Sequence, residues 1–271
     1  MHYTGKNVLI TGGSSGIGLA AAKMFSSLGA NLAIFGRDVK KLRQALKQIK
    51  AKKICDNQKF ACFQLDVAVN EDVKQTMEQV VREFGAPFIL INSAGMGGSF
   101  YFENVSYETF DQTVKTNLYG TRNTIAALLP SMKMQGGHIV NISSLGGLIG
   151  SFGYSAYSAS KFGVVGFSEC LRSELKRYTI MVSVLCPADV DTPMLAESQQ
   201  TSPPETRALS KSAGLMQPEE VAQTLLKGIQ KGHFLIIPGW NPKFVYAINR
   251  LCPCLQEFVM DTIVRKTQKN C

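Results

Sequence analysis

Seven short apolar runs, each separated from the next by a longer segment, limit this chain to a narrow class of folds. The runs are continuous rather than alternating, as expected for strands that are buried on both faces of a sheet. A helix between consecutive strands makes a right-handed crossover, which places the strands parallel to each other. The expected strands are residues 7–10, 31–35, 60–65, 88–91, 138–142, 180–185 and 234–237. This pattern predicts a single α/β domain with a doubly wound, seven-stranded parallel sheet flanked by helices.

Six further segments have the spacing of helices: residues 17–28, 39–49, 72–84, 109–132, 156–177 and 218–230. The last begins favourably, because Pro218 suits the first turn of a helix and Glu219 and Glu220 lie near its positive end. No linker, repeat or low-complexity tract divides the chain. We therefore expect one domain over residues 1–239, with a substrate loop at residues 187–216, and a helical extension over residues 240–271.

The composition argues against several classes of protein. With 271 residues, 45% of them hydrophobic, the chain can bury a large core. Seven cysteines without a CxxC pair, and only three histidines, argue against a disulfide framework or a metal site. The first apolar run is too short for a signal peptide, and none has the length of a membrane span. We expect a cytoplasmic protein with reduced cysteines.

A glycine-rich turn follows the first predicted strand. Its sequence, TGGSSGIG, places Gly12, Gly16 and Gly18 at the start of the first predicted helix, together with Ser14, Ser15 and Ile17. Glycines permit a close approach of the backbone, and the free N–H groups of a helix start can bind a pyrophosphate. A tight strand–helix turn without a ligand has the same pattern. Its place after the first strand favours dinucleotide binding.

The end of the second predicted strand bears on which dinucleotide is bound. NAD-binding folds carry an acidic residue there, which hydrogen-bonds the ribose 2′-hydroxyl. This chain has Arg37 instead, with Lys41 one helical turn later, and both cations suit a 2′-phosphate. Asp38 is a rival acidic candidate one residue further on, and an ordinary solvated charge run is the other reading. We expect the cofactor to be NADP(H).

A third group of residues has the composition of an acid–base site. Tyr157 and Lys161 are four residues apart and share one helix face, and Ser144 precedes Tyr157 by thirteen residues. A nearby ammonium group favours the phenolate, so we expect Lys161 to lower the pKa of Tyr157 from its ordinary value of about 10. Ser144 follows the fifth strand, which would deliver its hydroxyl to the same cleft.

In this order, the motifs closely resemble those of the short-chain dehydrogenase/reductase superfamily, from Lys6 to Pro238. The resemblance is carried by TGGSSGIG, Asp66-Val67, Asn92-Ser93-Ala94-Gly95, Asn117, Ser144, YSASK at 157–161, and Pro187 followed by Thr192. It implies a Rossmann-type sheet with strand order 3-2-1-4-5-6-7, and a homodimer or homotetramer. Ala188 departs from the usual Pro-Gly after the sixth strand, which narrows that turn slightly.

The resemblance also implies roles for single residues. Asp66 and Val67 would line the adenine pocket, and Asn92, Ala94 and Gly95 would pack on the ribose side of the cofactor. The segment from Pro187 to Thr192 would close over the nicotinamide. In the reaction, Tyr157 would donate a proton, Ser144 would bind the carbonyl, Lys161 would hold the nicotinamide ribose, and Asn117 would hold a water. Ser143 is a weaker candidate for the serine role than Ser144.

The segments DVDTP and PPETR, at 189–193 and 203–207, are similar to those of 3-ketodihydrosphingosine (3-ketosphinganine) reductases. This similarity implies an NADPH-dependent reduction of a long-chain lipid ketone on a cytosolic membrane face. A hydroxysteroid, a retinoid or a 3-oxoacyl thioester remains an alternative substrate. A non-catalytic NADP-sensing protein is the alternative outside enzymes, although Tyr157, Lys161, Ser144 and Asn117 are all present.

The C-terminal extension has apolar residues at helical spacing, from Phe244 to Ile263, interrupted by Arg250, Glu257 and Asp261. It could lie on an anionic membrane as a peripheral contact, cover the substrate pocket, or form a subunit interface. The net charge of +9 is concentrated elsewhere, with nine basic and two acidic residues between Arg37 and Lys59. No aromatic residues of a nucleic-acid surface accompany them, so we expect an anionic cofactor and no nucleic acid.

Overall fold

A seven-stranded parallel sheet forms the centre of the molecule, in a computed structural model that describes residues 2–269. Its strand order is β3-β2-β1-β4-β5-β6-β9, which confirms the predicted fold and order, since β9 is the seventh predicted strand. The strands are β1 (Asn7–Thr11), β2 (Asn31–Gly36), β3 (Phe60–Gln64), β4 (Ile89–Asn92), β5 (Gly137–Ile142), β6 (Ile180–Leu185) and β9 (Leu235–Ile236). Two more strands, β7 (Asp189–Val190) and β8 (Leu215–Met216), form a small separate sheet that was not predicted.

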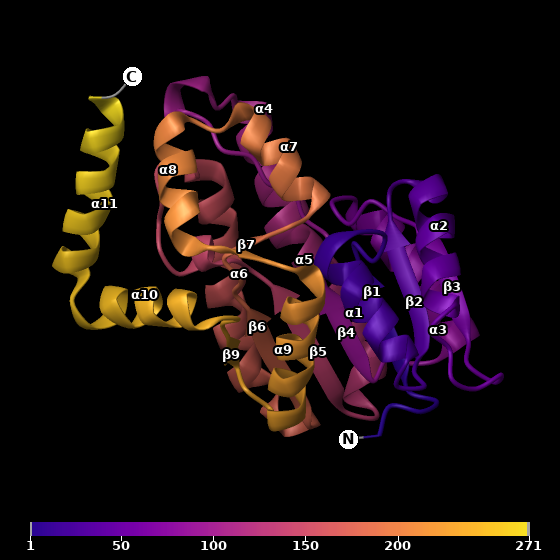
Figure 1. Ribbon diagram of the computed structural model, residues 1–271. Coiled ribbons are helices and arrows are strands. Elements are labelled where there is room, and N and C mark those ends of the chain that lie inside the picture. Colours follow the sequence, from indigo (N-terminus) through magenta and orange to yellow (C-terminus); the bar gives the residue numbers. More distant parts are fainter. Residues whose placement is uncertain (1, 270–271) are drawn as a thin grey trace.

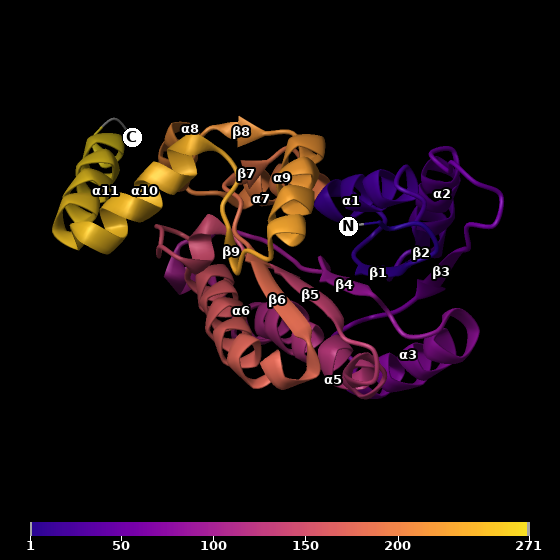
Figure 2. The same ribbon diagram turned by 90° about the horizontal axis from the view of Figure 1, so that it is seen from below.

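Helices cover both faces of the sheet, as Figure 2 shows. On one face lie α1 (Gly16–Ser26), α2 (Val39–Lys50) and α9 (Pro218–Lys231), and on the other α3 (Asn70–Phe84), α5 (Gly120–Lys133) and α6 (Ser155–Glu174). Successive side chains of β1 point to opposite faces, so Val8 and Ile10 join the first core cluster and Leu9 joins the second. Burial on both faces is the reason why the strands are continuous apolar runs.

The predicted helix at 109–132 is interrupted. The structure has α4 (Tyr107–Val114), then a π-helical turn, η2 (Lys115–Tyr119), and then α5. Single π-helical turns add a residue to a helix and are frequent at functional sites. This one contains Asn117. The other predicted helices agree to within a few residues, and α6 ends at Glu174, before the short 3₁₀ helix η4 (Lys176–Tyr178).

Four helices lie beyond the sheet, at the end of the molecule opposite α2 and β3 (Figure 1). They are α7 (Pro193–Thr201), α8 (Pro204–Ala213), α10 (Trp240–Leu251) and α11 (Pro253–Gln268), and α11 contacts α8. Two 3₁₀ helices, η1 (Phe102–Asn104) and η3 (Leu145–Gly147), complete the elements. None of the helices over residues 2–269 is long and apolar enough to cross a bilayer.

His138 is a buried polar residue within the sheet. On β5 it is 1% exposed, and its Nε2 lies 2.8 Å from the Ser183 hydroxyl oxygen on β6, whereas its Nδ1 has no partner in the described part of the chain. Burial lowers the pKa of His138 from 6.5 to about 4, because a charged ring would lose its hydration and leave a donor unpaired.

This lowered pKa predicts an acid-sensitive fold. As the pH falls below 6.5, the unfolded chain protonates His138 before the folded chain does, so stability decreases down to about pH 4. Between pH 7.5 and pH 5 this residue alone should cost about 2 kcal/mol of unfolding free energy. In urea unfolding, His138→Gln should lack this loss of unfolding free energy between the two pH values. The control His233→Gln, at an exposed position, should still show the loss. Equal pH slopes in the two variants would contradict the assignment.

Candidate active site

One pocket extends across the ends of the central strands and contains most of the residues predicted to form a site. It has a volume of about 510 Å³ and is bounded by β1, β2, β4 and β5, the segment after β6, and helices α7, α8, α10 and α11. Ligands of doubly wound sheets bind in this position, beyond the carboxyl ends of the strands.

The glycine-rich turn forms one end of the pocket, through Gly12, Ser14, Ser15, Gly16 and Ile17. Gly12 has a φ of +64°, and a Cβ on it would lie 2.7 Å from both the Ala94 nitrogen and the Ser93 oxygen. Only glycine therefore allows the two loops to approach this closely. The N-terminus of α1 begins within this turn, so its free N–H groups suit a pyrophosphate.

Gly18 does not line the pocket, although the sequence pattern placed it in the cofactor site. A Cβ on Gly18 would lie 2.4 Å from the Gly12 carbonyl oxygen. Its absence lets the first turn of α1 pack directly on the loop. Gly18 therefore shapes the site through backbone packing rather than through contact with its occupant.

Arg37 and Lys41 both line the pocket near the end of β2, as predicted, and so does Asp38. Asp38 is the N-cap of α2, and its carboxylate accepts hydrogen bonds from the backbone nitrogens of Lys40 and Lys41, at 2.8 and 3.1 Å. The hydrogen bond from Lys41 is the main reason why the pKa of Asp38 is lowered. The carboxylate is thus used in capping the helix, while the two cations line the pocket.

The predicted adenine residues Asp66 and Val67 line the pocket, and Ala94 and Gly95 line it further along. Asn92, predicted with them, is not among the residues that line the pocket. It is 2% exposed, and its side chain donates to the Asn141 amide oxygen at 2.9 Å and accepts from the Thr124 hydroxyl at 2.6 Å. Asn92 holds β4 to β5 and α5 behind the site.

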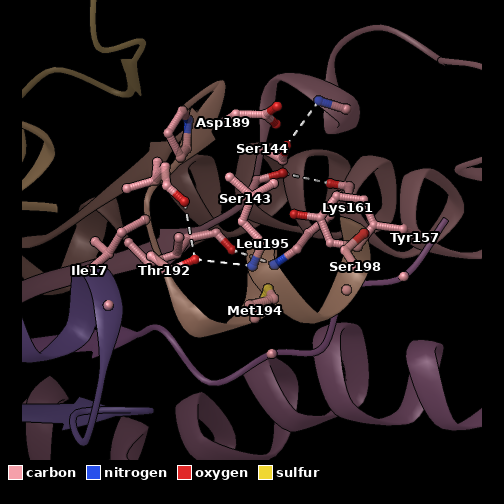
Figure 3. Close-up of a pocket in the computed structure, with 18 of the residues that line it drawn as sticks. Ile17, Ser143, Ser144, Tyr157, Lys161, Asp189, Thr192, Met194, Leu195 and Ser198 are labelled. Atoms are coloured by element: carbon pink, nitrogen blue, oxygen red, sulfur yellow. Dashed lines mark hydrogen bonds between the residues drawn. The ribbon is translucent and has the colours of Figure 1, made fainter. Parts of the chain in front are cut away.

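Ser144 and Tyr157 meet at the centre of the pocket (Figure 3). Burial raises the pKa of Tyr157 to about 12, and a hydrogen bond with Ser144 partly offsets this shift. The Ser144 hydroxyl oxygen also accepts from the Gly146 nitrogen at 3.1 Å. The Ser143 hydroxyl instead donates to the Lys161 carbonyl oxygen at 3.0 Å, so of the two serines it is Ser144 that bonds to Tyr157.

Lys161 lies in the pocket but does not act on Tyr157 as predicted. Its ammonium nitrogen donates to the Ile142 carbonyl oxygen at 2.9 Å and lies 5.7 Å from the centre of the Tyr157 ring. Burial lowers the pKa of Lys161 to about 8. Lys161 is not among the causes of the shifted Tyr157 pKa, which desolvation raises rather than lowers. The phenol stays protonated near neutral pH, which is the form that can donate a proton.

Asn117 does not line the pocket, and its side chain is bound to its neighbours. Its amide nitrogen donates to the Met96 oxygen at 3.0 Å and the Ser160 hydroxyl oxygen at 2.9 Å, and its amide oxygen accepts from the Met96 nitrogen at 2.8 Å. A Cβ on Gly95 would lie 3.1 Å from that amide oxygen and 3.6 Å from the Lys161 nitrogen. Asn117 therefore fixes the loop that follows β4 beside Lys161.

Pro187, Ala188 and Thr192 line the pocket as expected, and the segment they span leads from the sheet into α7. Thr192 caps α7 by accepting a hydrogen bond from the Leu195 nitrogen. A Cβ on Gly16 would lie 2.9 Å from the Thr192 methyl group, so the start of α7 touches the glycine-rich turn. Ala188 fits this path without disturbing it.

The other half of the pocket is mainly apolar and was not predicted residue by residue. It is lined by Ile149, Met194, Leu195 and Leu209, by the polar residues Tyr154, Asp189, Ser198 and Ser210, and by Val245, Val259, Met260 and Ile263 from α10 and α11. The helical spacing of residues 244–263 indicated an apolar face without showing what it contacts. The structure places part of that face on the pocket, which agrees with the covering role among the three alternatives.

Comparisons with known proteins agree with this geometry. The sequence pattern of the short chain dehydrogenase family matches residues 6–203. The chain is 39% identical over 236 residues to a 3-dehydrosphinganine reductase from Danio rerio. The matched region covers 86% of this chain and 71% of that protein.

Two solved structures have a similar fold. A short chain dehydrogenase/reductase from Burkholderia phymatum in complex with NAD has a TM-score of 0.79 and 25% identity, covering 93% of this chain and 94% of that one. A variant of actinorhodin polyketide ketoreductase with NADPH has a TM-score of 0.77 and 29% identity, covering 86% and 95%. One of these two structures thus contains NAD and the other NADPH.

Proposed function

This chain is an oxidoreductase of the short chain dehydrogenase family, and from that premise we propose that it reduces the 3-keto group of 3-dehydrosphinganine (3-ketosphinganine) with NADPH. The observation that carries the proposal is one pocket with two different halves. Glycines and cations line the half suited to a nucleotide, an apolar wall lines the other, and Ser144 and Tyr157 lie where the halves meet.

The residues at that junction suit a carbonyl reduction. The bound cofactor supplies the hydride. The Ser144 hydroxyl hydrogen-bonds the ketone oxygen and stabilises the charge that develops on it, and the protonated Tyr157 donates the proton that completes the alcohol. Lys161 lies one helical turn from Tyr157, on the cofactor side of it beside Gly95. The apolar wall, which includes Met194 and residues of the C-terminal helices, suits the hydrocarbon chain of the substrate.

Arg37 and Lys41 support NADPH as the preferred cofactor. Both cations lie in the nucleotide half of the pocket, and neither forms an ion pair with an acid in residues 2–269. A planar guanidinium group can bind a phosphate with two hydrogen bonds, which gives it preference over a ribose hydroxyl. The acid that could have selected NAD, Asp38, is engaged at the N-terminus of α2.

Arg37→Ala should therefore weaken NADPH binding by about 10- to 100-fold and leave NADH binding nearly unchanged. Titration of the two reduced cofactors by fluorescence would measure both constants. Arg43→Ala is a matched control, because Arg43 is an exposed arginine on α2, six residues further on, and does not line the pocket. An unmodified enzyme that prefers NADH, or a loss shared by both cofactors, would contradict the NADPH assignment.

Tyr157→Phe should lower the turnover of 3-ketosphinganine by about 10²- to 10⁴-fold, because the variant lacks the donated proton. NADPH oxidation measures this for a panel that also contains a steroid ketone, a retinoid aldehyde and a 3-oxoacyl thioester. The matched control is Tyr178→Phe, a tyrosine that contacts Lys133 and Arg177 outside the pocket. If the unmodified protein turned over another ketone faster, that ketone would replace 3-ketosphinganine as the proposed substrate. Full activity of Tyr157→Phe would exclude Tyr157 as the proton donor.

The C-terminal helices have a second apolar side, for which we propose contact with a membrane surface. Trp240 is 89% exposed, Leu251 86% and Phe258 69%, and basic residues such as Arg250 and Arg265 lie among them. Val259 is 44% exposed and also lines the pocket, so the exposed side lies next to the substrate half. A lipid substrate could then pass between the bilayer and the pocket with little exposure to water.

Co-sedimentation with liposomes of anionic lipid tests this contact. Replacement of Trp240, Leu251 and Phe258 by serine should at least halve the bound fraction, because these side chains would insert into the interface. Met134→Ser is the control, since Met134 is 88% exposed at the end of α5. Unchanged binding of the triple variant would exclude this surface.

A further inference from the structure

Asp189 is an acidic side chain in the substrate half of the pocket that the mechanism does not use. It belongs to the two-residue strand β7, whose pairing with β8 fixes its backbone. The other acids that line the pocket, Asp38 and Asp66, accept backbone hydrogen bonds at the nucleotide end. Figure 3 shows Asp189 among the side chains that line the pocket, together with Ser144 and Tyr157.

The Asp189 carboxylate has no cation beside it within residues 2–269. It accepts a hydrogen bond from the Ser210 hydroxyl on α8, and no lysine, arginine or histidine of the described chain forms an ion pair with it. Burial raises its pKa to about 6, and its charge raises the pKa values of Tyr154 and Tyr157. The carboxylate is thus desolvated, unpaired and within electrostatic range of the reacting phenol.

A partly buried carboxylate in a binding pocket is stabilised by a ligand that brings a positive charge. In 3-ketosphinganine the carbon that bears the amino group is bonded directly to the ketone carbon. If Ser144 and Tyr157 bind the ketone oxygen, the ammonium group must lie close to that oxygen. Asp189 lines the same pocket and acts electrostatically on Tyr157, whereas steroid, retinoid and oxoacyl ketones have no cation to place near it.

We propose that Asp189 binds the ammonium group of the amino ketone and so selects it over ketones of equal chain length. This inference rests on the proposed function. Asp189 is a specificity residue, which orients the ketone toward Ser144 and Tyr157 without exchanging a proton with it. The hydrogen bond from Ser210 fixes the carboxylate in place.

Asp189→Asn tests the proposal, because the amide keeps the shape of the carboxylate and can still accept from Ser210. The kcat/KM for 3-ketosphinganine should fall by about 10- to 100-fold, as for a lost hydrogen bond between charged groups. The kcat/KM for a 1-hydroxy-3-ketone of the same length without the amino group should change by less than about threefold. An equal loss with both ketones would overturn the proposal.

Asp191→Asn is the matched control, since Asp191 is an exposed acid two residues further on and does not line the pocket. It should leave the kcat/KM of both ketones unchanged. If Asp191→Asn changed the ratio of the two kcat/KM values as Asp189→Asn does, surface charge rather than the pocket carboxylate would attract the amino ketone.

A binding experiment separates this proposal from the proposed function. Calorimetric titration with sphinganine and with N-acetylsphinganine compares a charged ammonium group with a neutral amide, without any turnover. The unmodified protein should bind sphinganine at least tenfold more tightly, and Asp189→Asn should lose this preference. If the protein prefers sphinganine but does not reduce 3-ketosphinganine, only the proposed function fails. Equal affinity of the unmodified protein for sphinganine and N-acetylsphinganine would overturn the ammonium site.

Discussion

The close approach of the loops after β1 and β4 is the constraint on which the site depends. The Thr11 hydroxyl oxygen accepts hydrogen bonds from the Ser93 and Ala94 nitrogens, at 3.1 Å each, and Gly12 has no side chain to separate the two loops. The strand order reverses at this point, because β1 lies between β2 and β4. A crevice therefore forms here beyond the carboxyl ends of the strands, and the loops that follow the central strands line the pocket.

Desolvation in that crevice sets the protonation of the groups that do the chemistry. It raises the pKa of Tyr157 to about 12 and that of Asp189 to about 6, and it lowers that of Lys161 to about 8. All three shifts favour the neutral form, as expected of groups withdrawn from water. The same low dielectric strengthens the interaction of each charge with an oppositely charged ligand. Burial thus gives the pocket both a proton donor and its charge selectivity.

The sheet, its strand order and most of the cofactor half could be predicted from the sequence, because they depend on local patterns. Buried strands need continuous apolar runs, and a glycine-rich turn needs glycine at Gly12, where a Cβ would strike the backbone. Asn92, Gly18 and Asn117 are different. Each belongs to a recognisable motif, yet none of the three lines the pocket, and each instead packs on or bonds to a neighbouring residue: Asn141, the Gly12 oxygen and Met96, respectively. A motif identifies such residues without indicating on which side of the wall they lie.

The substrate half could not be predicted, because it is made by segments that meet only after folding. Asp189 reaches the pocket because β7 pairs with β8, so that Asp189 lies opposite Leu215, 26 residues later in the chain. In addition, the Ser210 hydroxyl on α8 donates a hydrogen bond to its carboxylate. The periodicity of α11 defines an apolar face but is equally compatible with a membrane, a second subunit or a pocket. Contact with α8 directs part of that face inward and leaves Phe258 outward. One amphipathic segment can therefore close the pocket and present a second apolar surface, since a helix has more than one side.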